Sequence, residues 1–168
     1  MDSTARVTVI GVGNEYRRDD GAGWAVVALL AERAGRMPLP GRPALVVCDG
    51  DPARLISHWD GAELAVVVDA AHAHPGQPGR VHRLELSGGP LARSEGAASS
   101  HGLGLGDAVE LARELDRLPR RLVVYAVEGA DCSPGTGLSA PVRAAVERLA
   151  ERIVARLAQH QGAADGAS

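Results

Sequence analysis

Short apolar runs alternate with stretches of helical spacing along this chain, and that alternation most constrains its fold. The run from Glu63 to Val68 is apolar without a break after its first residue, which is typical of a strand buried on both faces of a parallel sheet. Alternating strands and helices predict a three-layer α/β/α sandwich with a mostly parallel sheet. The predicted strands cover residues 6–10, 44–48, 63–68, 80–86 and 122–127, and the predicted helices cover residues 22–35, 52–59, 105–118 and 140–159.

The chain of 168 residues has the length of one domain, and its 45% of hydrophobic residues suffice for a core. We expect a single domain over residues 1–159, followed by a small polar tail over residues 160–168 that frays. Residues 80–86 alternate between apolar and polar side chains, which predicts a strand with one wet face near a sheet edge. Ser139 is placed to cap the last helix.

Composition excludes several classes of function. The net charge is −3 and aromatic residues make up 2% of the chain, so no nucleic-acid partner is expected. All 18 basic residues are arginine, which excludes a lysine base and a P-loop lysine. No stretch approaches the ~20 apolar residues of a membrane span, so we expect no membrane insertion and a cytoplasmic protein. Cys48 and Cys132 are too few for a disulfide framework and are expected to be structural or incidental rather than catalytic.

The glycine-rich loop after the first predicted strand is similar to a dinucleotide fingerprint but breaks it. Gly11 and Gly13 match the first two glycines, whereas Tyr16 stands where the third should be. Asp19 and Asp20 lie where a helix N-terminus would receive the pyrophosphate, and two carboxylates there would repel it. A dinucleotide-binding oxidoreductase is therefore a disfavoured alternative.

The same loop offers polar side chains with ordinary structural roles. Asp19 is expected to cap the following helix, and Asn14 is expected to form an Asx turn. Two adjacent aspartates are more than one cap needs, so Asp20 is free to act as a ligand or a base.

Two further candidates follow from the rule that ligands of open α/β sheets collect beyond the carboxyl ends of the strands. Asp69 comes directly after the third predicted strand, and an aspartate there is costly to bury unless it is paired or binds a cation. His101 ends a long loop rich in glycine and serine. Together with Asp20 these side chains could hold a divalent metal. His72 and His74 are expected to be solvated loop residues.

A series of motifs, taken in order, resembles the hydrogenase maturation proteases, the endopeptidases that trim the large subunit of nickel–iron hydrogenases. The likeness extends over nearly the whole chain, and its first motif is the most specific. The motifs are Gly11–Gly23, Asp49–Pro52, Val66–Asp69, Ser100–Leu103, and the pair Val127–Gly129 and Gly137–Ser139.

The resemblance implies a twisted sheet of five strands whose fourth strand runs antiparallel. It also implies that Asp20, Asp69 and His101 are the catalytic and metal-contacting residues. Residues around them would support the site: Gly13, Asn14, Asp19 and Asp49. The chain departs from the pattern at Glu15 and Tyr16, where relatives are often apolar or have proline, and at Gly129, where proline is common.

The function that the resemblance implies is removal of the C-terminal extension from the nickel-loaded precursor of a nickel–iron hydrogenase large subunit. The nickel is then supplied by the precursor, which is the partner protein. A metal held between the enzyme and its client needs no protein nucleophile, because it polarises the scissile carbonyl or activates a water. A non-catalytic checkpoint or chaperone that senses nickel insertion fits the same three residues, so it stays an alternative.

Overall fold

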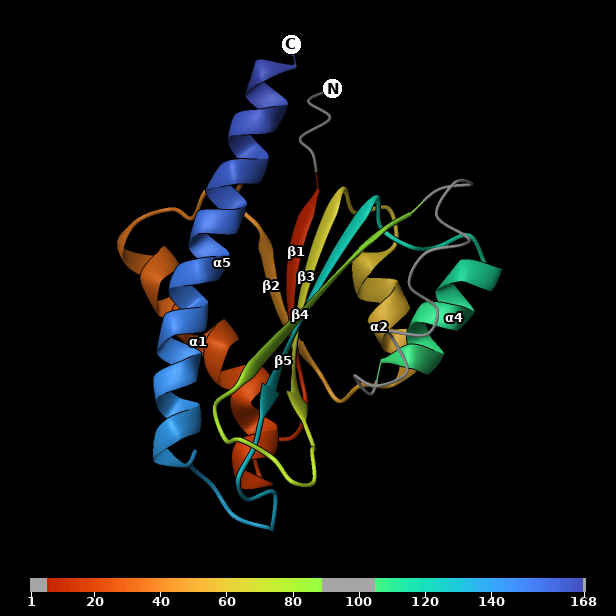
Figure 1. The fold of residues 1–168 in the computed structure, drawn as a ribbon. Coiled ribbons are helices and arrows are strands. Elements are labelled where there is room, and N and C mark those ends of the chain that lie inside the picture. Colours follow the sequence, from red (N-terminus) through yellow and green to blue (C-terminus); the bar gives the residue numbers. More distant parts are fainter. Residues whose placement is uncertain (1–5, 89–104, 168) are drawn as a thin grey trace.

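A computed structural model describes residues 6–88 and 105–167 of the chain (Figure 1). Strands and helices alternate along most of its length, in the order that the sequence predicted. The elements are β1 (Val7–Val12), the 3-10 helix η1 (Arg18–Gly21), α1 (Ala22–Arg36), β2 (Ala44–Cys48), α2 (Pro52–Trp59), β3 (Leu64–Ala71), β4 (Val81–Ser87), α4 (Gly106–Glu114), β5 (Arg121–Glu128) and α5 (Ala140–Gly166).

The strands form one twisted sheet in the order β2-β1-β3-β5-β4. All neighbouring pairs are parallel except β4 and β5, which are antiparallel. The antiparallel direction of the fourth strand, which the resemblance implied, and its place at an edge, which the alternation in residues 80–86 predicted, are both confirmed. From β1 the chain moves outward to β2 and then returns past β1 to β3, so the strand order reverses between β1 and β3. That is the position where open α/β sheets bind their ligands.

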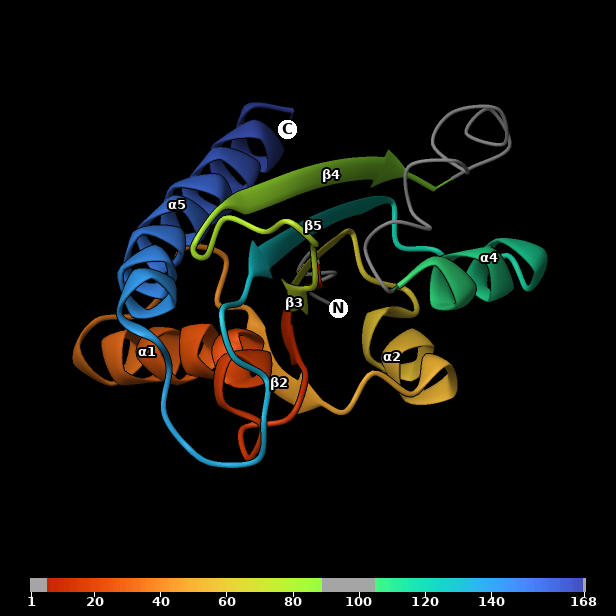
Figure 2. The ribbon, with the colours of Figure 1, turned by 60° about the horizontal axis from the view of Figure 1, so that its bottom comes forward.

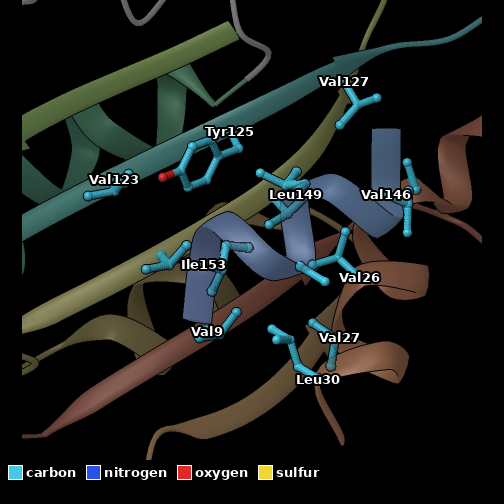
Figure 3. Packing of buried hydrophobic residues seen from close by; sticks show 14 of the residues in the cluster. Val9, Val26, Val27, Leu30, Val123, Tyr125, Val127, Val146, Leu149 and Ile153 are labelled. Carbon is cyan, nitrogen blue, oxygen red and sulfur yellow. The ribbon is translucent and has the colours of Figure 1, made fainter. Parts of the chain in front are cut away.

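Helices cover both faces of the sheet and complete the predicted three layers. Helices α1 and α5 lie on one face, and α2 and α4 lie on the other (Figures 1 and 2). The core under α1 and α5 joins Val26 and Leu30 of α1 to Leu149 and Ile153 of α5, above Val9 of β1 (Figure 3). The core is built almost entirely from aliphatic side chains, as a chain with so few aromatic residues requires.

The central strand β3 is buried on both faces, as its unbroken apolar run predicted. Val66 and Val68 belong to the core on the side of α1 and α5, while Ala65 and Val67 belong to the core on the opposite side. The strand continues to Ala71, beyond the predicted end, because its pairing with β5 extends through its last residues. The sequence-based prediction ended this strand too early.

The C-terminal helix also differs from its prediction. Helix α5 continues to Gly166, through most of the segment that was expected to be a frayed tail after residue 159. Gln161, within that segment, accepts a hydrogen bond from the amide of Gly41 at 3.1 Å. Among the described residues, no helix combines the length and the apolar character needed to cross a membrane.

Candidate active site at the carboxyl ends of β1 and β3

The segment after β1 is held directly on the ends of the strands. A side chain at Gly23, near the start of α1, would place its Cβ 2.3 Å from the carbonyl oxygen of Val68 and 2.7 Å from that of Val12. Gly11 is equally crowded, since a Cβ there would lie 2.4 Å from the carbonyl oxygen of Gly23. Only glycine permits this approach. The close packing positions the turn before α1, which carries Asp20, over the strand ends.

The loop between β1 and η1 is closed by its own hydrogen bonds. Asn14 Oδ1 accepts from the amide of Tyr16 at 2.9 Å, so the predicted Asx turn is confirmed. The amide of Asn14 donates to the carbonyl oxygen of Asp20 at 3.2 Å. Gly13 has a φ of +136°, and a Cβ there would lie 2.0 Å from that same oxygen. Gly13 and Asn14 therefore fix the backbone on which Asp20 is mounted.

Asp19 has a different role from the helix cap that was expected, and that prediction is wrong. Its side chain is fully buried and accepts hydrogen bonds from the amides of Ala130 (2.8 Å), Asp131 (3.0 Å) and Ser139 (2.8 Å). The hydroxyl of Ser139 also donates to it at 2.8 Å. Asp19 lies within the turn η1, two residues ahead of Gly21, which is the N-cap residue of α1. Asp19 instead ties the loop 129–139 to the loop after β1.

The electrostatics of Asp19 follow from this arrangement. Burial alone would raise its pKa, but the hydrogen bonds from Ser139, Asp131 and Ala130 stabilise the carboxylate and keep its pKa below the ordinary value. Asp19 is thus a structural anion, satisfied within the protein. The hydroxyl of Ser139 is used for this bond, so Ser139 does not cap α5 in the predicted way.

Backbone hydrogen bonds hold the two loops side by side (Figure 2). The amide of Arg18 donates to the carbonyl of Gly135 at 3.1 Å, and the amide of Gly135 donates to the carbonyl of Tyr16 at 2.8 Å. The amide of Asp19 donates to the carbonyl of Asp131 at 2.9 Å. Because these partners are more than a hundred residues apart, spacing in the sequence carries no signal for them.

Asp69 occupies the end of β3, where it pairs with Ala126 of β5, rather than following the strand as predicted. Its Oδ1 accepts from the amide of Ala70 at 2.8 Å. Burial raises the pKa of Asp69 to about 7, opposed by that hydrogen bond, and the negative charge of Asp20 raises it further. Asp20 is thus close enough for its charge to act on Asp69, at the strand reversal between β1 and β3. A carboxyl group with this pKa exchanges its proton near neutral pH, and a nearby cation would stabilise its ionised form.

The third predicted ligand, His101, lies outside the described residues. Within residues 6–88 and 105–167, no group of three or more histidine, cysteine, aspartate or glutamate side chains is arranged to hold a metal. Asp20 and Asp69 would thus need further ligands from the remainder of the chain or from a client. The side chain of Asp49 bonds to residues close to it in the chain. Its Oδ1 accepts from the amide of Asp51 at 3.1 Å, and its Oδ2 accepts from Arg54 Nη1 at 3.2 Å.

Cys132 and His72 border the site, and no local pattern in the sequence predicted that they lie close together. Cys132 Sγ lies 3.7 Å from Nδ1 of His72, which is exposed as predicted. Burial raises the pKa of the Cys132 thiol, and the charges of Asp20 and Asp19 raise it further. The thiol therefore stays protonated at neutral pH, which fits the structural role expected for it. Only the folding of loop 129–139 onto the strand ends reveals this contact.

Glu128, at the end of β5, fixes a second loop beside the site. Its buried carboxylate accepts from the amide of Gln77 at 3.2 Å and lies 2.9 Å from His82 Nε2. The bonds to His82 and Gln77 lower the pKa of Glu128. The chain between β3 and β4 is thereby held against β5. Sequence reasoning missed this residue because it reads as an ordinary strand end.

Comparison with known proteins identifies close likenesses over most of the chain. The sequence profile of the hydrogenase maturation protease family matches residues 29–156. The hydrogenase 2 maturation protease of Escherichia coli K12 is 28% identical over 154 residues, which are 90% of this chain and 90% of that protein.

Solved structures show the same fold. The hydrogenase maturating endopeptidase HybD from E. coli superposes with a TM-score of 0.70 at 26% identity, over 92% of this chain and 93% of that one. The [NiFe] hydrogenase maturation protease HybD from Thermococcus kodakarensis superposes with a TM-score of 0.66 at 29% identity, over 91% of this chain and 99% of that one.

Proposed function

The chain belongs to the hydrogenase maturation protease family, as its motifs indicated, and on that premise we propose that it removes the C-terminal extension of a nickel-loaded hydrogenase large-subunit precursor. The observation that carries the proposal is that Asp20 and Asp69 lie near enough to interact electrostatically where the strand order reverses between β1 and β3. Two half-buried carboxylates whose charges interact at the strand ends would both gain stability from a bound cation. Carboxylate oxygens by themselves favour harder divalent ions, and the imidazole of His101 would add the kind of donor that suits nickel.

In this proposal the nickel is part of the substrate, because the precursor brings it to the site. Asp20 and Asp69 contact it from the side of the protease, and His101 supplies a third contact. A bound metal supplies Lewis acidity, which polarises the scissile carbonyl or acidifies a water. Asp69, whose pKa lies near 7, is also placed to hold or release a proton during hydrolysis.

The same electrostatics support recognition of loaded precursor over empty precursor. Without a cation, ionised Asp20 and Asp69 repel each other, and the raised pKa of Asp69 reflects part of that cost. A divalent ion converts this repulsion into attraction. Affinity then depends on nickel insertion, so processing follows metal loading.

The structure of the loop after β1 disfavours a dinucleotide-binding oxidoreductase. In place of a phosphate cradle it carries Asp20 at the strand ends, while its backbone amides at Asn14 and Asp19 donate to the carbonyl oxygens of Asp20 and Asp131. An anion there would meet like charge and few free donors. A thermal shift with NAD or NADP checks this, and none is expected.

Incubation with a nickel-loaded precursor, followed by mass measurement of the product, tests the proposal and separates a protease from a non-catalytic checkpoint. Asp20→Asn and His101→Ala should each lower the cleavage rate on the order of a hundredfold or more. Asp165→Asn, an exposed change near the end of α5, is the matched control and should cleave at the normal rate. Cleavage by Asp20→Asn at the normal rate refutes its role, and equal cleavage of nickel-free precursor refutes recognition of the metal.

A further inference from the structure

Cys132 and His72 form a pair of side chains able to bind a metal, and the proposed mechanism does not use them. They are 60 positions apart in the sequence and lie in different loops, yet Cys132 Sγ lies 3.7 Å from His72 Nδ1. A thiol is a weak hydrogen-bond donor, so this contact adds little stability by itself. Around one tetrahedral ion, a sulfur at about 2.3 Å and an imidazole nitrogen at about 2.0 Å lie roughly 3.5 Å apart. The two donor atoms therefore already have nearly the separation of two ligands on one ion.

The backbone on both sides of the Cys132 thiol is fixed. The carbonyl oxygen of Cys132 accepts from Nε of Arg17 at 3.3 Å. The preceding residue, Asp131, donates its amide to Asp19 Oδ2 at 3.0 Å, and its carbonyl oxygen accepts from the amide of Asp19 at 2.9 Å. Gly129 leaves space for the sulfur, because a Cβ there would lie 3.4 Å from Cys132 Sγ and 3.0 Å from Asp19 Cβ. The thiol is thus held in place before any ligand arrives, which lowers the cost of binding one.

His72 extends from the end of a central strand. It directly follows Ala71, the last residue of β3, which pairs with Glu128 of β5 and accepts at its carbonyl oxygen from the amide of Gly129 at 3.1 Å. These bonds anchor the backbone from which the imidazole projects. His72 is exposed and Cys132 is partly exposed, so an ion from outside can reach both donor atoms.

The surroundings of the pair are negatively charged. The charges of Asp20 and Asp19 act on the Cys132 thiol, and the amide of Asp20 is near enough to donate a hydrogen bond to its sulfur. Negative charge disfavours a free thiolate but attracts a divalent cation, and a bound cation deprotonates a coordinating thiol outright. This environment therefore suits a thiolate only when a metal ion is bound to it.

We propose that Cys132 and His72 are a two-ligand site, next to Asp20, for a borderline divalent ion such as nickel. Binding joins the ion to Sγ and Nδ1 and releases the thiol proton to solvent. The inference rests on the proposed function for the source of the ion, which is the precursor, and two protein ligands leave the other positions to the precursor's own ligands or to water. Thiolate and imidazole favour nickel over hard ions such as magnesium. The pair would then select the kind of ion, whereas the carboxylates respond mainly to its charge.

Addition of nickel chloride to the purified protein, without precursor, tests the pair directly. Thiolate bound to nickel gives a charge-transfer absorption in the near ultraviolet, and we expect it in wild type and not in Cys132→Ser. The other cysteine of the chain, Cys48, remains in that variant and is an internal control. Magnesium chloride should bind equally to wild type and to Cys132→Ser, because a hard ion gains nothing from the sulfur.

Calorimetry with the same nickel salt measures the affinity. It should fall at least about tenfold in Cys132→Ser and in His72→Gln, because even the loss of a group that only supports a ligand costs about that much. His72 is exposed, so His72→Gln should fold as wild type does. His74→Gln, an exposed histidine two positions further along the same loop, is the matched control and should bind nickel as wild type does.

Three results would overturn the proposal. These are no sulfur absorption in wild type with nickel, an absorption that persists in Cys132→Ser, and a loss of affinity in His74→Gln as large as in His72→Gln. Failure of the proposed function is recognised separately in the cleavage assay. An absorption that depends on Cys132, in a protein that leaves the loaded precursor uncut, supports the two-ligand site and refutes the protease role. Cleavage of loaded precursor by a protein without the absorption does the reverse.

Discussion

Replacing Asp19 with asparagine should destabilise the fold far more than the same replacement at Asp20. The two residues are adjacent, and both changes keep the shape of the side chain while removing its charge. Asp19 is fully buried and accepts four hydrogen bonds from the loop 129–139, whereas Asp20 is half-buried at the strand ends. The pair therefore compares a structural carboxylate with a functional one.

The size of the effect follows from the geometry at Asp19. Oδ2 accepts hydrogen bonds from the amides of Ala130 and Asp131 and from the hydroxyl of Ser139. Oδ1 accepts only from the amide of Ser139. The asparagine amide is least harmful at the position of Oδ1, where it leaves one buried N–H unsatisfied at a cost of about 1–3 kcal/mol. The other three bonds lose their charge assistance, about 1 kcal/mol each, offset in part because no charge is buried. The expected loss is about 3–5 kcal/mol, a large part of the stability of a typical domain.

Urea unfolding at pH 7 measures this loss, with Asp20→Asn as control and an expected change there within about 1 kcal/mol. Hydrogen exchange of the amides of Ala130, Asp131 and Ser139 detects the same effect if only the loop opens. Because the pKa of Asp19 is depressed in the fold, its contribution is present above its ordinary value of 3.8 and is lost as pH falls below that. The difference between wild type and the variant should therefore shrink in acid.

The reasoning about Asp19 would be refuted by a variant that is as stable as wild type. Asp19→Asn with a free energy of unfolding within about 1 kcal/mol of wild type, and with unchanged exchange at Ala130 and Ser139, would show that the bonds to Asp19 do not hold the loop.

Two further changes test the site and its support. The pKa of Asp69 is raised from 3.8 to about 7, so stability should fall as pH rises between these values and level off above them. At about 1.4 kcal/mol per pKa unit the whole fall is at most about 4 kcal/mol, of which about 3 kcal/mol lies between pH 5 and pH 8. Urea unfolding at these two pH values should show this part in wild type but not in Asp69→Asn. Gly23→Ala should cost at least about 3 kcal/mol in thermal or urea unfolding, because its Cβ would meet backbone oxygens of Val68 and Val12. Gly35→Ala, in the same helix with nothing within 4 Å, should instead stabilise by about 0.5–1 kcal/mol, and equal effects of the two changes would contradict the packing argument.

Much of the fold could be predicted because its signals are local. The unbroken apolar run before Asp69 indicated a central parallel strand, and the alternation in residues 80–86 indicated an edge strand, which is antiparallel in the structure. Errors concentrated at boundaries: β3 extends to Ala71 because β5 pairs with it, and α5 extends to Gly166. The strand that pairs with the end of β3, and the loop residue Gly41 that bonds to Gln161 of α5, cannot be recognised from the sequence of either segment alone.

Some residues of the candidate site could also be predicted from local signals, and others could not. Asp20 and Asp69 could be selected because polar residues after strands collect at one edge of a parallel sheet, and the structure places them near enough to interact electrostatically. His101 stays a prediction, since it lies outside the described residues. The role of Asp19 could not be predicted, because a buried aspartate before a helix has the same local sequence as a cap.

By itself the sequence determined the order of strands and helices, the aliphatic core and the carboxylates at the strand ends. Each of these depends on the period of apolar residues or on the chemistry of a single side chain. Only the tertiary structure decided what lies next to those carboxylates. The bond network of Asp19 and the contact of Cys132 with His72 both join segments far apart in the chain. Such contacts are set by how strands are ordered and how loops close on them, and no local period encodes that.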